Sequence, residues 1–449
     1  MKKGTPQFCE VPFFHLFGEK LLAMFKLKQI HDISIDSYGG LQFFHRFIEK
    51  TDFEKVVRQE LGDRPAQAQY SYKDVITTFA AMCLAGGSYT EDINILRSKQ
   101  SSLAGSSYCS SDTFTRVTKQ LMDWDHMELK ETEKGTETEF FFNQPMNGLL
   151  LHSFKRYFGV KGYKTLDHDH TKIFTNKPDA KACYKGKGYY ASFFSADQIP
   201  LYVSMQSGNA TPKSDLVEVL RQGFQAIQEA GLSFEIFRAD GACYSEAVIQ
   251  LVLEHSLYYV VRSQKSQFRQ KTIDPSACTY ITIGEVDYRV FEETDIFAGK
   301  PCRRIYYQIV QQEKHLFSGQ EFSEIITNLP TEEFSTGQVI AFYFARGAEE
   351  RMFDEIKNDF LLAHLPFTEA PYNLCYAIMS ALSLLLFRAF KKFVHVVLGD
   401  YIRPKMRVKQ VLFRLFAFPA RMIHRSRQYT YNLYCRQKEL KPLIRWANH

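Results

Sequence analysis

The order of two hydrophobic periodicities in residues 162–263 constrains the fold of this 449-residue chain most strongly. Three segments there alternate apolar and polar residues, as strands half-buried in a sheet do: GYKTLDHDHT, GYYASFFSA and PLYVSMQSG. A helical pattern, the strand FEIFRAD, a second helical pattern and the strand LYYVVRS follow in that order. The predicted order of elements is therefore β-β-β-α-β-α-β, which indicates an α/β core.

The periodicity outside this core divides the rest of the chain. Residues 1 to about 135 read mainly helical, and the charged, turn-rich stretch KETEKGTETE at residues 130–139 marks the boundary that follows. The expected units are a helical N-terminal domain (1–135), the first part of the core domain (136–263), a β-rich insertion (264–340), the second part of the core domain (341–398) and a basic C-terminal region (399–449).

A polar stripe runs along one predicted helix after the insertion, in YFARGAEERMFDEIKNDF. The spacing Tyr343-x2-Arg346-x3-Glu350-x6-Lys357 places four side chains within roughly 60° of arc on one face of a single α-helix. Apolar residues fall on the opposite side of the same wheel, so the helix can bury one face. An amphipathic surface helix with a solvated charged face would show the same pattern, and the rest of the chain must decide between the two interpretations.

Carboxylates occur at the positions where such a core would gather them. Asp169 lies on the first predicted strand, Asp240 ends FEIFRAD, and Glu350 lies on the polar stripe. A divalent-metal nuclease needs carboxylates from several elements, because Mg²⁺ takes hard oxygen ligands and bridges the attacking and leaving oxygens. Asp167 shares a strand face with Asp169 and competes with it for the first position, whereas His170 is expected to face away from the carboxylates.

Charge is distributed unevenly along the chain. Residues 388–449 carry 15 Lys and Arg against two carboxylates, interleaved with Tyr and Phe, whereas the rest of the chain is net negative. This composition suits a polyanion whose bases can also be stacked on, although a solvated helical face would look alike. Nine scattered cysteines without a CxxC pair, and no recognisable signal peptide, favour a cytoplasmic location. The apolar run 377–387 is too short to span a bilayer, so we expect a buried helix and no membrane partner.

The N-terminal region contains one candidate for DNA recognition. Ser110-Ser111-Asp112 forms an N-cap cluster before TFTRVTKQLM, after a Gly/Ser turn at residues 105–107. This arrangement is similar to the entry into the recognition helix of a helix-turn-helix, although many helical hairpins look the same.

These motifs together resemble a known family. LDHDHT, RADGACYS and the set Tyr343, Arg346, Glu350 and Lys357, with a β-rich insertion before the last, are similar to the DDE transposases of bacterial insertion sequences. The resemblance is closest to the group with a Tyr-Arg-Glu-Lys signature, and it covers most of the chain. It implies a ribonuclease-H-like catalytic domain with a mixed sheet, preceded by a helical DNA-binding domain.

The resemblance also implies an activity and its partners. The chain would be an endonuclease and strand transferase that cuts insertion-sequence ends and joins them to target DNA, in cut-and-paste transposition. Asp169, Asp240 and Glu350 would hold two Mg²⁺ ions, for which Mn²⁺ could substitute. Tyr343, Arg346 and Lys357 would contact terminal phosphates. The partners would be double-stranded DNA, namely the terminal inverted repeats and target DNA, with a second copy of the chain in a homodimer on DNA.

Two other interpretations stay open on the residues alone. LDHDHT fits the Asp-x-Asp-x-Thr motif of haloacid-dehalogenase-like phosphatases, with Asp167 as the nucleophile, although such a phosphatase needs a parallel doubly wound sheet. The other is a transposase-derived DNA-binding protein that has lost catalysis. One departure from the family also stands out. Some relatives stack a flipped base on a Trp of the insertion, but Trp124 and Trp446 both lie outside it, so either a Tyr such as Tyr288 or Tyr306 substitutes or the device is absent.

Overall fold

The computed structural model describes most of the chain. The described residues are 35–100, 108–123, 125–131, 137–159, 164–264, 273–310, 322–425 and 428–448. The start of the chain, the turn predicted at residues 105–107 and the middle of the predicted linker at 130–139 lie outside them.

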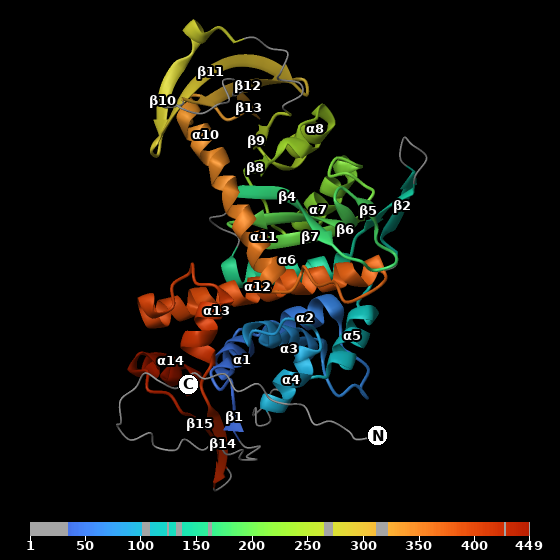
Figure 1. Cartoon of the computed structure of the whole chain (residues 1–449), viewed down its shortest axis with the longest axis vertical. Helices are drawn as coiled ribbons and strands as arrows, with labels where there is room; N and C mark the ends of the chain where they lie inside the picture. Colours follow the sequence, from blue (N-terminus) through green and yellow to red (C-terminus); the bar gives the residue numbers. More distant parts are fainter. Residues whose placement is uncertain are drawn as a thin grey trace, which may run out of the picture.

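A large mixed sheet forms the centre of the described molecule (Figure 1). Its strands follow the spatial order β10-β11-β12-β13-β9-β8-β4-β6-β7-β3-β2, with β5 paired to β6. Their bounds are β2 (Met127–Glu131), β3 (Glu137–Phe141), β4 (Thr165–Phe174), β5 (Lys181–Cys183), β6 (Gly186–Ala196), β7 (Ile199–Ser207), β8 (Ile236–Ala239), β9 (Tyr258–Arg262), β10 (Thr279–Ile283), β11 (Val286–Phe297), β12 (Lys300–Ile309) and β13 (Ser323–Thr327). Because β2 and β3 pair with each other and β3 pairs with β7, both ends of the predicted linker at 130–139 are strands of the sheet.

The five middle strands confirm the predicted order of elements. Strand β4 pairs antiparallel with β6, which pairs antiparallel with β7, as expected for a meander. On its other edge β4 pairs parallel with β8, and β8 pairs parallel with β9. Helices α7 (Leu216–Glu229) and α8 (Glu246–His255) make the two connections that parallel pairing requires.

Four strands fall within the range predicted to be β-rich. Strands β10 to β13 pair antiparallel in sequence order, and β13 then pairs antiparallel with β9, so they extend the central sheet. They share a second apolar cluster with helix α10 (Thr336–Phe344), which includes Val290, Ile305 and Ile340. Helix α10 therefore starts on the β-rich part and carries the chain back toward the middle of the sheet (Figure 1).

One long apolar helix lies between the sheet and the N-terminal helices (Figure 1). It is α12 (Ala370–Leu398), and its neighbours contribute to one continuous apolar cluster. The other helices are α1 (Leu41–Lys50), α2 (Phe53–Leu61), α3 (Tyr72–Leu84), α4 (Asp92–Lys99), α5 (Ser111–Gln120), α6 (Gln144–Phe158), α13 (Val408–Val411) and α14 (Lys441–Asn448). Among the described residues, Ala370–Tyr401 is long and apolar enough to cross a membrane, but 94% of its most apolar window is buried in the protein. The expected buried helix is thus confirmed.

The helix with the polar stripe is not a single α-helix. Helix α10 ends at Phe344, a 3₁₀ turn covers Ala345–Gly347, and α11 (Ala348–Asn358) follows. A 3₁₀ turn advances about 120° per residue instead of about 100°, so residues before and after it no longer share one face. The prediction of one continuous face was therefore wrong for Tyr343, which lies before the turn and is buried in the second apolar cluster.

A small sheet joins the two ends of the described chain. Strand β1 (Ile35–Asp36) pairs with β14 (Ala420–Arg425), which pairs with β15 (Gln428–Leu433). The hydroxyl of Tyr431 donates a hydrogen bond to the Asp36 carboxylate over 2.7 Å. Part of the basic C-terminal region is thus held against the N-terminal helices, although its β-hairpin stands out from the body of the molecule (Figure 1).

Candidate active site

Two of the three predicted carboxylates lie on neighbouring parallel strands, Asp169 within β4 and Asp240 directly after β8. The last register pair between β4 and β8 joins His168 to Ala239, so Asp169 and Asp240 are the next residues on the two chains. The carboxylate of Asp240 accepts a hydrogen bond from the Ala242 amide, which caps the 3₁₀ turn after β8. Its negative charge adds to burial in raising the pKa of Asp169. The sheet itself therefore brings these two acids together.

Arg346 lies against this pair. Its Nη1 donates to Oδ2 of Asp169 over 2.6 Å, and both side chains are partly exposed, at 20% for Arg346 and 17% for Asp169. Burial opposes the charge of Arg346, but Asp169, Tyr343 and Asp240 together raise its pKa. The permanent positive charge of Arg346 thus lies close to the carboxylates of Asp169 and Asp240.

The third predicted carboxylate, Glu350, lies in the first turn of α11 and is exposed. It follows Arg346 by four residues, about one helical turn, so the element that brings Arg346 to Asp169 also brings Glu350 to the same end of the sheet. Lys357 is in the last turn of α11, and partial burial lowers its pKa. Tyr343 is only 5% exposed, and burial raises its pKa. Three of the four stripe residues therefore reach the surface, and the tyrosine does not.

The competing aspartate has a different environment. Asp167 accepts two hydrogen bonds from Arg238 of β8, Nε to Oδ1 at 2.6 Å and Nη2 to Oδ2 at 2.9 Å. The side chains are 3% and 9% exposed. Arg238 also donates to the carbonyl of Phe342 in α10, and its guanidinium lies 4.7 Å from the centre of that ring. This buried ion pair thus connects β4, β8 and the helix that leads into Arg346.

Arg238 was missed in the sequence, although a signal was present. It stands inside the otherwise apolar strand FEIFRAD, where an uncompensated arginine would be costly to bury. Its partner is 71 residues away on another strand, so only the tertiary structure identifies it.

Glu349 is the buried neighbour of Glu350. It is 2% exposed and accepts a hydrogen bond from the Ser195 hydroxyl over 2.7 Å. Burial, together with the negative charge of Asp167, raises the pKa of Glu349 to about 7. Adjacent glutamates on α11 therefore differ sharply: one faces the interior beside Asp167, and the other faces solvent.

The two histidines around Asp169 lie on the other face of β4. His168 is buried, and its Nε2 lies 2.8 Å from the Ser192 hydroxyl. The rings of His168 and His170 meet edge to face at 4.8 Å. Alternation along the strand thus separates both imidazoles from the Asp167 and Asp169 side chains, as predicted for His170.

The donor set suits a hard cation, although it is not assembled around one. Within the described ranges, no group of three or more His, Cys, Asp or Glu side chains is arranged to hold a metal ion. Asp169 and Asp240 nevertheless offer carboxylate oxygens, the ligands Mg²⁺ prefers, and the guanidinium already near them is a cation attracted by the same charge. Asp169 and Asp240 therefore have the donor chemistry for Mg²⁺ or Mn²⁺, whereas Glu350 lies exposed on α11.

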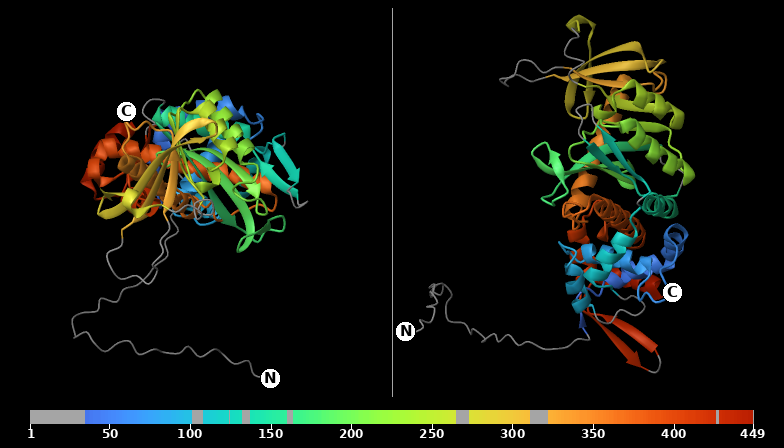
Figure 2. Two further views of the ribbon diagram at one scale, coloured as in Figure 1. Left: turned by 90° about the horizontal axis from the view of Figure 1, so that it is seen from above. Right: turned by 90° about the vertical axis from the view of Figure 1, so that its right-hand side faces the viewer.

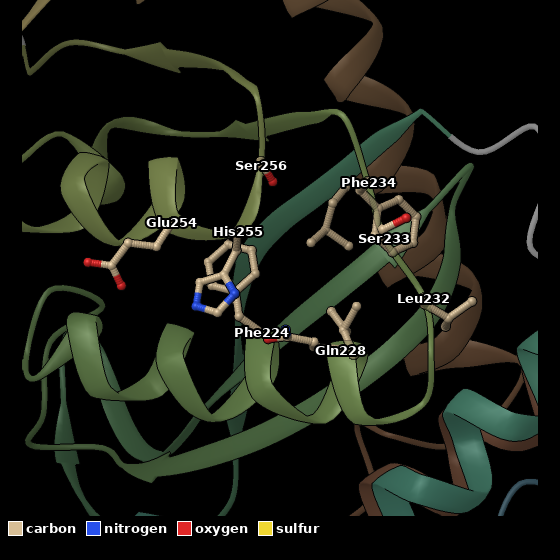
Figure 3. Close-up of a pocket in the computed structure, with 10 residues that line it drawn as sticks. Phe224, Gln228, Leu232, Ser233, Phe234, Glu254, His255 and Ser256 are labelled. Atoms are coloured by element: carbon tan, nitrogen blue, oxygen red, sulfur yellow. The ribbon is translucent and has the colours of Figure 1, made fainter.

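The pocket drawn in Figure 3 lies elsewhere. It has a volume of about 150 Å³ and is bordered by Leu166, Phe234 and the C-terminal residues of α8. His255 stacks on Phe224 there, with ring centres 4.8 Å apart. Leu166 lies at the start of β4 and Phe234 precedes β8, whereas Asp240 follows β8, so this pocket opens at the opposite end of the parallel pair.

Comparisons with known proteins address the family of the chain and not the roles of single residues. A family model described as "Transposase DDE domain group 1" matches residues 29–442. One similar solved structure is described as a cryo-EM structure of piggyBac transposase in a synaptic complex with hairpin DNA. Its alignment has 11% identity, covers 84% of this chain and 78% of that chain, and gives a TM-score of 0.41, which is too weak to support an argument. The comparison with curated proteins finds no match.

Proposed function

The chain belongs to the transposase DDE domain family, group 1, and on that premise we propose that it catalyses metal-dependent cut-and-paste transposition. The proposed substrates are the terminal inverted repeats of its own insertion sequence and a target DNA. Asp169, Asp240 and Glu350 are the proposed catalytic residues, within a ribonuclease-H-like domain.

One observation supports this assignment above the others. Asp169, in the middle of β4, and Asp240, directly after β8, follow the last register pair of the two parallel strands, and Arg346 of the following helical segment contacts the first of them. Carboxylates on neighbouring strands, with a third on a helix that crosses the sheet, are what metal-dependent phosphodiester cleavage requires. The strand order β7-β6-β4-β8-β9 also agrees with a ribonuclease-H-like core.

The metal would be held by Asp169, Asp240 and Glu350. When bound, two Mg²⁺ or Mn²⁺ ions would supply Lewis-acid stabilisation of the oxygens that attack and leave the phosphorus. Arg346 would exchange its contact with Asp169 for a phosphate oxygen of the DNA, because guanidinium groups bind both oxyanions with the same donors. Lys357 would contact a further phosphate as a point charge.

The role of Tyr343 needs to be revised within this proposal. Its ring is buried, and the Arg346 guanidinium lies 5.8 Å from the ring centre. Tyr343 would therefore support Arg346 by a cation–π contact and reach phosphate only after a rearrangement. Tyr288 and Tyr306 are also buried, so neither offers a stacking face for a flipped base as it stands.

DNA would be recognised outside this site by the N-terminal and C-terminal regions. Helix α5 begins with the predicted cap, since the Ser110 hydroxyl accepts a hydrogen bond from the Thr113 amide over 3.2 Å. Its outer face exposes Arg116, Lys119 and Gln120. These are side chains that hydrogen-bond to bases or phosphates in a major groove, which supports a recognition role for α5.

The direct test is excision from a plasmid that carries the coding region with its native flanking DNA. We expect the native chain to excise the element with Mg²⁺ or Mn²⁺, and Asp240→Asn to abolish excision while DNA binding persists. DNA binding by the native chain without excision or strand transfer would instead support the non-catalytic alternative.

The phosphatase alternative loses its support. Strand β6, the next strand to pair with β4, is antiparallel to it, unlike in a doubly wound sheet, and Asp167 is buried in two hydrogen bonds with Arg238. A carboxylate held in this way cannot approach a phosphate as a nucleophile.

A further inference from the structure

A small basic tip stands out from one face of the sheet (Figure 2). It consists of the end of β4, strand β5 and the start of β6, where Phe174 and Lys181 pair with Gly188 on its two sides. Residues 172–187 contain five lysines and one carboxylate: Lys172, Lys177, Lys181, Lys185, Lys187 and Asp179. This local excess of positive charge is notable because the chain before residue 388 is net negative.

Two aromatic side chains are exposed among these lysines. Phe174 is 52% exposed and Tyr184 is 74% exposed. Large aromatic side chains are usually buried in a soluble domain, and an exposed pair among lysines is typical of surfaces that bind unpaired bases. The tip therefore has both of the groups that a single DNA strand needs: cations for phosphates and flat faces for bases.

Lys172 holds the rings in place. Its Nζ lies 5.5, 5.4 and 4.9 Å from the ring centres of Phe174, Tyr184 and Tyr190, and it donates to the Tyr184 carbonyl over 2.9 Å. The backbone of Gly186 passes close to Phe174, since a Cβ there would approach the ring at 3.3 Å. The rings are thus positioned by cation–π contacts and a bare backbone, which leaves much of their surface open to a ligand.

The tip is separate from the proposed active site. Along β4, Lys172 and Phe174 share the face of His170, whereas Asp169 is on the opposite face. At about 3.3 Å per residue, Phe174 lies roughly 17 Å along the strand from Asp169. A DNA segment on the tip is therefore different from the segment whose phosphate is cleaved.

We propose that this tip binds a DNA strand with unpaired bases, in which Phe174 and Tyr184 stack on bases and Lys181, Lys185 and Lys187 contact phosphates. The proposal rests on DNA being the substrate, as the proposed function requires. Opening of the duplex near a cleaved end would supply such a strand. The role of the tip is to hold that strand away from the proposed catalytic carboxylates, and the tip takes no part in the chemistry.

The test compares the full-length native chain with variants by fluorescence anisotropy. The probes are a labelled 20-nucleotide oligothymidylate and a 20-base-pair duplex. Phe174→Ser/Tyr184→Ser should weaken oligothymidylate binding about 10-fold and leave duplex binding within about twofold, because stacking needs unpaired bases. Tyr89→Ser is the matched control for loss of an exposed ring and should bind both probes like the native chain.

Charge is tested separately. Lys181→Gln/Lys185→Gln/Lys187→Gln should reduce the salt dependence of oligothymidylate binding by about two phosphate contacts. The control, Lys55→Gln/Lys164→Gln/Lys300→Gln, removes three exposed lysines from other elements and should keep the native slope. Equal loss of both probes in the ring variant, or no loss of either, would overturn the proposal.

A measurement on the native chain avoids dependence on variant folding. Irradiation of oligothymidylate containing 5-iodouracil should crosslink to Tyr184 or Phe174, located by mass spectrometry. Crosslinks confined to other segments would contradict the proposal. Neither readout requires catalysis, so a catalytically inactive chain that crosslinks through the tip would refute the proposed function and leave the tip assignment standing.

Discussion

Strand β4 carries two aspartates that each pair with an arginine, and the two ion pairs differ in burial and in the number of hydrogen bonds. Asp167 and Arg238 are buried and joined by two hydrogen bonds, whereas Asp169 and Arg346 are joined by one and remain partly exposed. We call the buried set, with Glu349 and Ser195, the lower tier, and the exposed set, with Asp240 and Glu350, the upper tier. The lower tier should stay intact, because loss of one partner from a buried ion pair leaves an uncompensated buried charge. The upper tier can exchange partners, which a catalytic site must do.

The largest expected difference is between the two aspartates. Asp169→Asn should lower the rate of element-end cleavage about 10³-fold without a comparable loss of stability, since it would remove a proposed metal ligand, and such a ligand stabilises the transition state by several kcal/mol. Asp167→Asn should act mainly through folding, because it leaves the Arg238 charge without its partner. Cleavage rates and urea unfolding of both variants separate the two effects. If Asp167→Asn lost cleavage while keeping native stability, the assignment of the tiers would be reversed.

The two arginines should differ next. Arg238→Met leaves a buried carboxylate unpaired and is expected to lower the free energy of unfolding by about 3–5 kcal/mol. Arg346→Met removes a partly exposed partner and should cost about 1 kcal/mol or less. Urea denaturation without divalent ions measures both. Similar losses for the two variants would contradict the division into a fixed tier and an exchangeable tier.

Binding of a metal ion should have a smaller effect on stability, and this effect should depend on the upper tier alone. Mn²⁺ at about 100 times its dissociation constant should stabilise the native chain by about 2.7 kcal/mol, which corresponds to roughly 2–4 °C for a chain of this size. Arg346→Met should increase the shift, because the guanidinium no longer competes for Asp169. Thermal unfolding with and without Mn²⁺ tests this. An unchanged shift in Asp169→Asn would show that the ion binds elsewhere.

The lower tier should make the free energy of unfolding depend on pH. Glu349 has a pKa of about 7 in the folded chain against an ordinary value of 4.5, so the folded state holds its proton more tightly than the unfolded state. The contribution of Glu349 to stability is therefore fully present below about pH 4.5 and is lost as pH rises through 7, by about 1–3 kcal/mol. Glu349→Gln should flatten this slope, and Glu350→Gln should preserve it. Urea unfolding between pH 5 and 8 measures the difference.

The sequence predicted the strands that carry the site better than the difference between the lower tier and the upper tier. Alternation in LDHDHT and the apolar run in FEIFRAD were sufficient for β4 and β8, because strand periodicity is local. Placing Asp169 beside Asp240 then followed from the order of the strands. What separates Asp167 from Asp169 is an arginine on another strand, and no local pattern contains that information.

The helix after the insertion illustrates the other limit. Its downstream apolar positions, Met352, Ile356 and Phe360, are buried as predicted. The 3₁₀ turn at Ala345–Gly347 changes the angle before them, so Tyr343 turns inward. Helical spacing does not reveal such a turn, because three residues are too few to show a period of their own.

The adjacent glutamates of α11 provide the most direct test of the central claim. Single-turnover cleavage of element-end DNA should be measured with Mn²⁺ for Glu349→Gln and Glu350→Gln, two changes of the same chemistry one residue apart. We expect Glu350→Gln to lose about 10³-fold in rate, whereas Glu349→Gln should stay within about tenfold of the native chain. Near-native cleavage by Glu350→Gln together with loss in Glu349→Gln would contradict it.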